Sequence, residues 1–174
     1  MNLANKLTVA RVIAVPFFIF MFIKGLYFPA ALIFALASIT DFLDGQIARR
    51  NNLVTNFGKI MDPLADKILV YSALCLLIDV KAVPAWTLIV ILAREFIVSG
   101  MRTVAASEGI VISAGMSGKL KTLLQMVAVE GLILSLGPFP NLMKLSMWIY
   151  WAALVVTVYS GIEYIWKNKD IFKM

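Results

Sequence analysis

Six long apolar stretches follow one another along the chain, and polar segments separate them. Each stretch approaches the ~20 residues that a helix needs to cross the hydrocarbon core of a membrane. We therefore expect an all-α polytopic membrane protein with six transmembrane helices, because only helices or closed barrels can span a bilayer. The predicted spans are residues 7–23, 28–48, 63–78, 84–106, 120–136 and 142–166.

The connections between these stretches alternate in length along the chain. Those at residues 24–27, 79–83 and 137–141 are short, whereas those at 49–61 and 107–119 are longer. No linker and no shift in composition interrupts the sequence. We therefore expect residues 1–174 to form a single membrane domain.

Positive charge is distributed unevenly between the two predicted sides of the membrane. Thirteen of the 16 Lys and Arg residues fall on the side that holds both termini and the longer connections. Such an excess marks the cytoplasmic side of membrane proteins. We therefore expect a multi-pass protein of the cell membrane with both termini cytoplasmic. Its partners should include membrane lipids, to which basic residues are attracted, and no nucleic acid.

Composition agrees with a membrane protein and limits the chemistry available to it. Hydrophobic residues make up 61% of the chain and the mean hydropathy is +0.90, whereas soluble domains are usually about 45–50% apolar. The chain has no His and one Cys, Cys75. Any metal site should therefore be built from oxygen ligands, which favours Mg²⁺, Mn²⁺ or Ca²⁺.

Four aspartates are the strongest candidates for such a site. Asp41 and Asp44 are three residues apart and Asp62 and Asp66 are four apart, so each pair shares one face of a helix. They lie at the predicted cytoplasmic ends of the second and third spans. Buried carboxylates repel one another unless cations neutralise them, so divalent ions between the pairs would explain the cluster.

Each part of this cluster has a simpler interpretation. Asp62 precedes Pro63, which is typical of a helix N-cap followed by proline at the first helical position. Asp41 and Asp44 could be interfacial charges at a helix end.

The small residues Gly45 and Ala48 on the same face favour close approach of a ligand, and Arg49 can bind phosphate oxygens.

The full spacing, Asp41-x2-Asp44-Gly45-x2-Ala48-Arg49-x8-Gly58-x3-Asp62-x3-Asp66, resembles the complete signature of the CDP-alcohol phosphotransferase family. The six-helix layout resembles that family along essentially the whole chain. The resemblance implies an integral membrane enzyme that displaces CMP from a CDP-linked lipid or alcohol. It also implies that the chain can form a homodimer.

The resemblance further implies roles for individual residues. Asp41, Asp44 and Asp62 would be ligands of divalent metal, two Mg²⁺ or Mn²⁺ ions, and Asp66 both a ligand and the general base. The cytidine diphosphate site would be lined by Gly45, Ala48, Arg49 and Gly58, and the family-like run NKLTVAR would add Asn5 and Thr8. In the alternative interpretation, this N-terminal run is a helix cap followed by a snorkelling anchor, Arg11.

Basic residues outside the signature indicate which alcohol accepts the phosphatidyl group. Converging cations suit an acceptor that carries its own phosphate, and the candidates are Lys59, Arg94, Arg102, Lys119 and Lys121. The strings REFIVSGMR and GKLKT also resemble the phosphatidylglycerophosphate synthase branch. We therefore expect CDP-diacylglycerol as donor and glycerol 3-phosphate as acceptor. An ion pair between Arg94 and Glu95 is not expected, because adjacent residues of a helix do not face each other.

Three alternatives remain open from the sequence. Lys119 and Lys121 could be ordinary cytoplasmic anchors. The acceptor could be inositol phosphate or serine, with the same chemistry at the aspartates. A divalent-cation transporter could also use four aspartates, but it would require carboxylates near the bilayer midplane and repeated broken helices, and neither pattern is present in the sequence.

Overall fold

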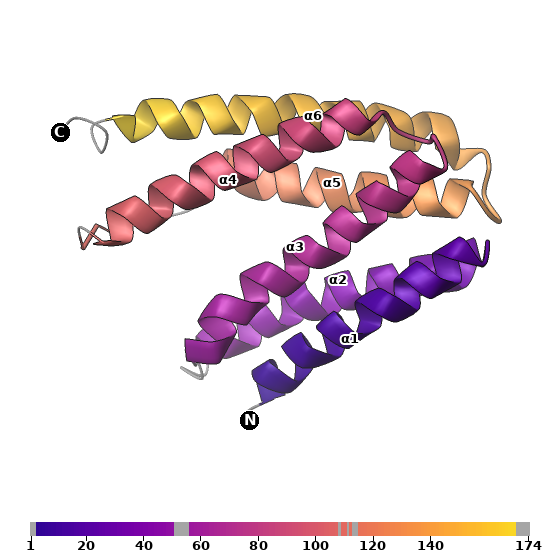
Figure 1. Ribbon diagram of the computed structural model, residues 1–174, viewed down its shortest axis with the longest axis horizontal. Helices are drawn as coiled ribbons and strands as arrows, with labels where there is room; N and C mark the ends of the chain where they lie inside the picture. The colour runs from indigo at the N-terminus through magenta and orange to yellow at the C-terminus, as the bar shows by residue number, and fades with distance from the viewer. Residues whose placement is uncertain (1–2, 51–55, 108, 111, 113–114, 170–174) are drawn as a thin grey trace.

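The computed structural model describes residues 3–50, 56–107, 109–110, 112 and 115–169, and side chains at 3–7, 41–50, 56–63 and 66 lie outside that description. Within these residues the chain forms six α-helices and no strand (Figure 1). The all-α prediction is confirmed. The helices are α1 (Leu3–Ile23), α2 (Tyr27–Arg50), α3 (Asn56–Asp79), α4 (Ala85–Ser107), α5 (Met116–Ser135) and α6 (Leu142–Lys167).

Every predicted stretch coincides with one helix, but α1, α3 and α5 begin four, seven and four residues earlier than predicted. α3 begins at Asn56, so the expected start at Pro63 is wrong, and Asp62 lies inside the helix instead of capping it. Hydropathy marks only the apolar part of a helix, whereas residues 56–62 mix polar and apolar side chains. A proline inside a helix removes one backbone hydrogen bond without necessarily ending the helix.

The helices run back and forth along the long axis of the molecule (Figure 1). The α1–α2, α3–α4 and α5–α6 connections lie at one end, whereas α2, α4 and α6 finish toward the other, where α1 begins. α5 pairs with α6, and α1 packs against both α2 and α3. α3 also contacts α4 and α5, so it joins the first three helices to the last three.

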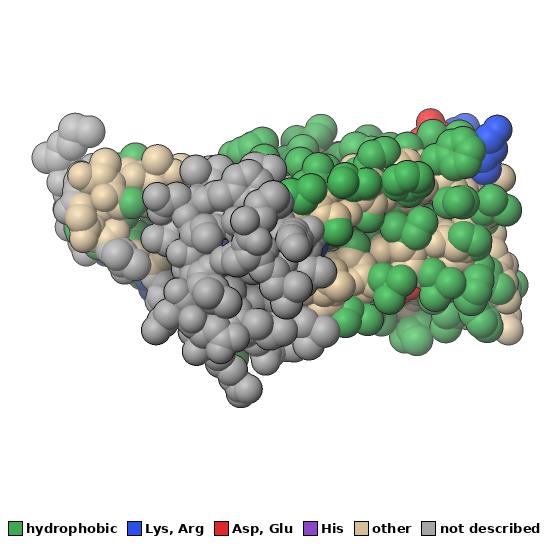
Figure 2. Space-filling model, turned by 90° about the horizontal axis from the view of Figure 1, so that it is seen from below, with side chains coloured by type: hydrophobic (Ala, Val, Ile, Leu, Met, Phe, Trp, Pro, Cys, Tyr) green, Lys and Arg blue, Asp and Glu red, His purple; other side chains and the backbone are tan. Residues whose placement is uncertain are grey.

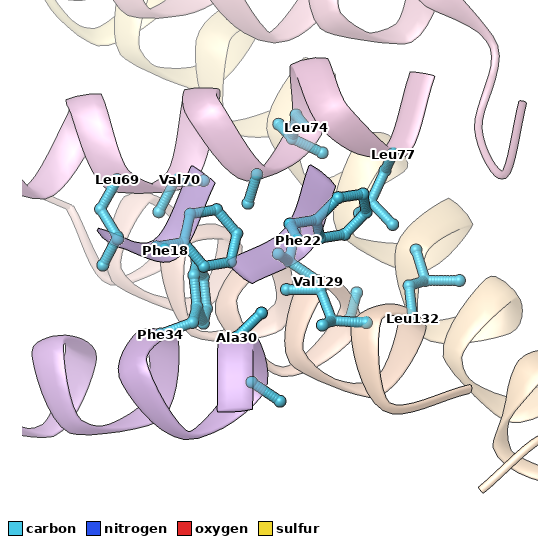
Figure 3. Packing of buried hydrophobic residues seen from close by; sticks show 14 of the residues in the cluster. Phe18, Phe22, Ala30, Phe34, Leu69, Val70, Leu74, Leu77, Val129 and Leu132 are labelled. Atoms are coloured by element: carbon cyan, nitrogen blue, oxygen red, sulfur yellow. The ribbon is translucent and has the colours of Figure 1, made fainter. Parts of the chain in front are cut away.

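The hydrophobic core lies where α1, α2, α3 and α5 meet (Figure 3). The rings of Phe18 and Phe34 pack at a tilt of 50° with centroids 5.9 Å apart, and Leu69 and Val129 pack into the same cluster. All four side chains are almost fully buried. Because this cluster holds α2 and α3 together, it also positions the two helices that carry the aspartates.

On the face seen in Figure 2, the described side chains are predominantly hydrophobic. Large side chains such as Phe96, Trp148 and Trp166 are each more than 70% exposed, at 71%, 76% and 72%. Apolar surface on this scale indicates contact with lipid or with another protein. Among the described residues, α6 alone is long and apolar enough to cross a membrane by length and composition. Spanning by all six helices therefore stays a prediction.

Three described helix ends, after α1, α3 and α4, have the same helix-ending motif, and the one after α3 has an unusual residue. After α1, Gly25 has φ 73°, and the amides of Gly25 and Leu26 donate to the carbonyls of Phe22 and Met21. After α3, Lys81 occupies the equivalent position at φ 59°, and its amide donates to Ile78. This is the Schellman ending, which favours glycine at the left-handed position.

Replacing Lys81 with Gly is therefore expected to raise the melting temperature of the purified protein. A side chain at a left-handed position costs about 1 kcal/mol relative to glycine. Thermal unfolding in detergent measures the effect. Gly25→Ala is the matched control, and it should lower the melting temperature because it introduces the same strain at the end of α1. An unchanged melting temperature in Lys81→Gly would contradict the expectation.

Candidate active site

The four signature aspartates lie on two helices that contact each other. Asp41 and Asp44 are on α2, Asp62 and Asp66 are on α3, and the backbone is helical at all four positions. The helical spacing predicted from the sequence is therefore present, and α2 packs against α3. The aspartate side chains lie outside the described residues.

The residues predicted to bind the CDP-lipid are placed by their backbone. Gly45, Ala48 and Arg49 follow Asp44 on α2, and Gly58 precedes Asp62 on α3, with side chains outside the description. The predicted nucleotide residues of the N-terminal run, Asn5 and Thr8, are on α1. α1 begins at Leu3, so Asn5 is not the helix cap of the alternative interpretation.

Arg11 ties α1 to α2 just before the aspartates. Its side chain is buried, with 3% of the residue exposed, and its Nε donates to the carbonyl of Ala37 at 3.3 Å. Ala37 lies one helical turn before Asp41. Thr8, one turn earlier on α1, is equally buried. A buried Arg11 does not fit the interpretation of a snorkelling anchor, and it holds this part of α1 against the helix that carries Asp41.

A buried ionic cluster forms around Glu95 of α4. Oε1 accepts from Arg94 Nη1 at 3.0 Å and, at closer range, from Lys121 Nζ of α5. Oε2 lies 3.3 Å from Nζ of Lys67 on α3. Three helices therefore each contribute at least one charged side chain to one point, and we call these four residues the Glu95 cluster.

Arg94 is held by further contacts with α6. Its Nε donates to Ser160 Oγ at 3.2 Å. The neighbouring Gly161 makes room for it, because a Cβ built there would lie 2.9 Å from Arg94 Cγ. A Cβ at Gly118 of α5 would lie 3.4 Å from Arg94 Nη2, which is an ordinary contact. The guanidinium is therefore fixed by α4, α5 and α6 together.

The cluster carries more positive than negative charge. Three cations surround one carboxylate, so their summed charge is +2. The side chains of Lys121, Arg94 and Glu95 are only 7%, 10% and 10% exposed, and that of Lys67 is 34% exposed. Burying charge is costly unless it is paired. Two nearly buried cations and one partly exposed cation around a single carboxylate indicate a site that receives an anion.

The ion pair between Arg94 and Glu95 corrects the sequence-based expectation that these neighbours would not meet. Adjacent Cα–Cβ bonds on a helix do point apart. The Arg94 side chain is long enough to curve back, and its contact with Ser160 at Nε turns Nη1 toward Glu95. The rule for adjacent residues applies to short side chains better than to Arg.

The other predicted acceptor residues either lie apart from the Glu95 cluster or have side chains that the structure does not describe. Arg102 is two helical turns beyond Arg94 on α4, where its Nε donates to Tyr164 Oη at 3.1 Å. Lys119 is exposed at the start of α5, and Lys59 is on α3 with its side chain outside the description. Of the five predicted cations, the structure brings Arg94 and Lys121 together.

Two members of the cluster were missed by the sequence analysis as site residues. Lys67 directly follows Asp66, and Glu95 is an acidic residue within an apolar run. A charged residue inside an apolar helix is itself a signal of function. Lys67 also donates to Ser99 Oγ at 3.2 Å, which fixes it against α4. The cluster therefore begins one residue after the last signature aspartate.

Comparison with known proteins assigns the chain to a family. The model of the CDP-alcohol phosphatidyltransferase family matches residues 1–159, from the start of the chain into α6. The chain belongs to the CDP-alcohol phosphatidyltransferase family. The resemblance inferred from the aspartate signature is therefore confirmed.

Named members of the CDP-alcohol phosphatidyltransferase family resemble the chain over nearly its full length. A Bacillus subtilis protein named CDP-diacylglycerol–glycerol-3-phosphate 3-phosphatidyltransferase is 42% identical over 188 residues, covering 99% of this chain and 97% of the relative. A Rickettsia bellii protein of the same name is 41% identical, covering 98% and 97%. A Mycobacterium tuberculosis protein named probable phosphatidylglycerophosphate synthase is 40% identical, covering 94% and 80%.

Proposed function

We propose that the protein transfers the phosphatidyl group of CDP-diacylglycerol to glycerol 3-phosphate, giving phosphatidylglycerophosphate and CMP. A hydroxyl oxygen of glycerol 3-phosphate attacks the phosphorus that bears the diacylglycerol. The bond from that phosphorus to the oxygen of CMP breaks, and CMP leaves. Family membership supports the displacement of CMP, and the names of the relatives support this donor and acceptor.

The observation that carries the choice of acceptor is the Glu95 cluster. Its cations converge within a buried site that begins next to Asp66. Glycerol 3-phosphate brings a phosphate that such a cluster can bind through charge-assisted hydrogen bonds. Serine has no phosphate, so it would leave the excess positive charge of the cluster unbalanced. Of the alternative acceptors, inositol phosphate is the hardest to distinguish from glycerol 3-phosphate by this observation, because it also carries a phosphate.

Divalent metal at the four aspartates is part of the proposal, as two Mg²⁺ or Mn²⁺ ions. The donor set fits, because hard cations prefer carboxylate oxygen and α2 and α3 present their aspartates at helical spacings. Lys67, the cation next to Asp66 in sequence, is engaged with Glu95 and Ser99. The ions would supply charge neutralisation on the pyrophosphate oxygens.

Asp66 is the proposed general base, and it takes the proton of the attacking hydroxyl. The chain has no His, so a carboxylate is the best candidate for this role at neutral pH. Asp41, Asp44 and Asp62 are the proposed metal ligands together with Asp66. Gly45, Ala48, Arg49, Gly58, Asn5 and Thr8 form the proposed CDP-lipid site. No covalent intermediate is required.

The proposed setting is the cell membrane, with six spanning helices and both termini in the cytoplasm. The alternating direction of the helices supports this, because α1 begins toward the end where α6 finishes (Figure 1). The exposed apolar side chains support a lipid environment. The active site would then face the cytoplasm, from which the water-soluble glycerol 3-phosphate could reach it. Homodimer formation also remains part of the proposal.

One assay tests the proposal. Purified protein receives labelled CDP-diacylglycerol, Mg²⁺ or Mn²⁺, and in turn glycerol 3-phosphate, inositol phosphate, serine or no acceptor, and CMP release is measured. Release that requires glycerol 3-phosphate is expected. Release with a different acceptor alone would overturn the choice of acceptor. No release with any acceptor would overturn the proposed enzymatic function and favour the cation transporter. Measurement of ion flux into vesicles that contain the protein would then test for transport.

Gly161→Ala is expected to raise the KM for glycerol 3-phosphate by about ten-fold. The added methyl group would lie 2.9 Å from Arg94 Cγ and displace the guanidinium, and one charge-assisted hydrogen bond is worth about 1.5–3 kcal/mol. Gly118→Ala is the matched control, because its methyl group makes only an ordinary contact with Arg94. Equal KM values in the two variants would contradict the placement of Arg94 in the acceptor site.

Arg102→Ala is expected to raise the same KM by a smaller factor, about three-fold. Its side chain is exposed and bonded to Tyr164, two turns from the Glu95 cluster, and exposed charges contribute about 0–1 kcal/mol. Initial rates at varied glycerol 3-phosphate measure the effect. Tyr164→Phe serves as control, since it removes the hydrogen bond and keeps the cation. A KM unchanged in Arg102→Ala would remove this residue from the acceptor site.

A further inference from the structure

Glu95 occupies the position where the three cations of the Glu95 cluster meet. Its Oε1 accepts hydrogen bonds from Arg94 and Lys121, and its Oε2 forms an ion pair with Lys67 at 3.3 Å. A structural ion pair needs one cation for one carboxylate, whereas this carboxylate has three cations drawn from three helices. The excess of cations indicates that the arrangement serves a second anion.

The cations keep hydrogen-bond donors for such an anion. Lys67 has three donors, and among the described residues one of them is used for Ser99, while its Nζ also forms an ion pair with Glu95. Arg94 has five donors, and those contacts use Nη1 and Nε. The remaining donors belong to groups that already point toward the carboxylate. A phosphate beside Glu95 could therefore be bound without moving these side chains far.

The charge of the cluster matches a phosphate monoester. Three cations and one carboxylate sum to +2, and a phosphate monoester carries about −1.5 to −2 at pH 7. Without Glu95, the three cations would face one another with three mutual repulsions. Glu95 offsets these repulsions, so the cations converge on one point before the substrate arrives.

Glu95 also repels the incoming phosphate, so the two effects must be compared. The negative charge of Glu95 repels the roughly two negative charges of the phosphate. Against this, Glu95 offsets three repulsions among the cations and orders their three long side chains. Ordering groups before binding lowers the cost of binding. We take the ordering effect as the larger of the two, and the KM of Glu95→Gln tests this balance.

We propose that Glu95 is the positioning residue of the acceptor site: it gathers Lys67, Arg94 and Lys121 and sets their summed charge at +2, so that the site selects acceptors that carry a phosphate dianion. The inference rests on the proposed function, since glycerol 3-phosphate is such an acceptor. Glu95 itself touches neither the reacting hydroxyl nor the pyrophosphate. Its effect is transmitted through the three cations.

The first experiment compares Glu95→Gln with Glu95→Asp in the full-length protein. Glu95→Gln should raise the KM for glycerol 3-phosphate about ten-fold and change the KM for CDP-diacylglycerol less than two-fold. Glu95→Asp keeps the charge and should recover part of the loss. Glu130→Gln is the matched control, because Glu130 of α5 has a buried oxygen without a hydrogen-bond partner among the described residues, and its KM values should match those of the wild type.

A KM for glycerol 3-phosphate in Glu95→Gln that is unchanged or lower than in the wild type would overturn the proposal. Parallel increases in both KM values would do the same, because they would indicate a general structural role. If Glu95→Gln does not fold, Lys67→Met replaces it. Loss of this cation should raise the KM for glycerol 3-phosphate and leave the KM for CDP-diacylglycerol unchanged.

A second measurement does not depend on catalysis. Inorganic phosphate, compared with chloride at matched ionic strength, should raise the melting temperature of the wild-type protein and of Glu130→Gln, but not that of Glu95→Gln. If the wild type releases no CMP with glycerol 3-phosphate and yet shows this pattern, the proposed function fails and the phosphate site stands. If phosphate has no effect on the wild type, the inference about Glu95 fails.

Discussion

Asp66→Asn is expected to lower the kcat of CMP release by about a thousand-fold, while binding of CDP-diacylglycerol stays measurable. General-base catalysis contributes about 10²–10⁴-fold to rate, and the amide of Asn cannot accept the proton. It keeps an oxygen at the same place on α3, so the fold and the lipid site should persist. Initial rates and direct binding of labelled CDP-diacylglycerol measure the two properties separately.

The control for this variant is Asp79→Asn. Asp79 is on the same helix but at its opposite end, where it is exposed, so its loss should leave kcat unchanged. Asp66→Asn with near-normal turnover would show that the general base is another residue. Loss of lipid binding together with turnover would show that Asp66 acts mainly in holding the donor.

Removal of divalent metal is expected to abolish CMP release, a loss of roughly a thousand-fold or more, because metal ions stabilise developing charge by several kcal/mol. Dialysis against EDTA followed by addition of Mg²⁺ or Mn²⁺ tests reversibility. The melting temperature should fall with EDTA and recover with metal, since a ligand that binds the folded state stabilises it.

Potassium chloride at the ionic strength of the added metal salt is the control, and it should restore neither activity nor stability. Full turnover after exhaustive dialysis against EDTA would exclude a metal requirement and overturn the proposed role of the four aspartates as metal ligands. A fall in melting temperature without loss of turnover would assign the metal a structural role.

The sequence predicts the helices well because long apolar runs leave few alternatives. Its error at α3 has a physical cause. Residues 56–62 continue the helix with mixed polarity, and Pro63 is tolerated inside it. Hydropathy therefore reports where a helix is apolar and does not report where it begins.

The site was predictable to different degrees. The aspartate spacing was readable because both pairs are local within one helix, and it led directly to the family that the comparison confirmed. The Glu95 cluster joins α3, α4 and α5, and residue spacing carries no information about contacts between helices. Arg94 pairs with Glu95 and is also held by Ser160 of α6, a contact that no rule about neighbouring residues includes.

A bilayer that thins or thickens tilts the helices embedded in it. Asp66 and Lys67 are consecutive on α3, so any tilt of that helix carries the proposed base and one phosphate-binding cation together. Their offset along the axis is about 1.5 Å, the rise of a single helical residue. A movement of α3 against its neighbours would therefore keep Lys67 beside the proposed base, but it would change the distance of both residues from Arg94 on α4 and Lys121 on α5.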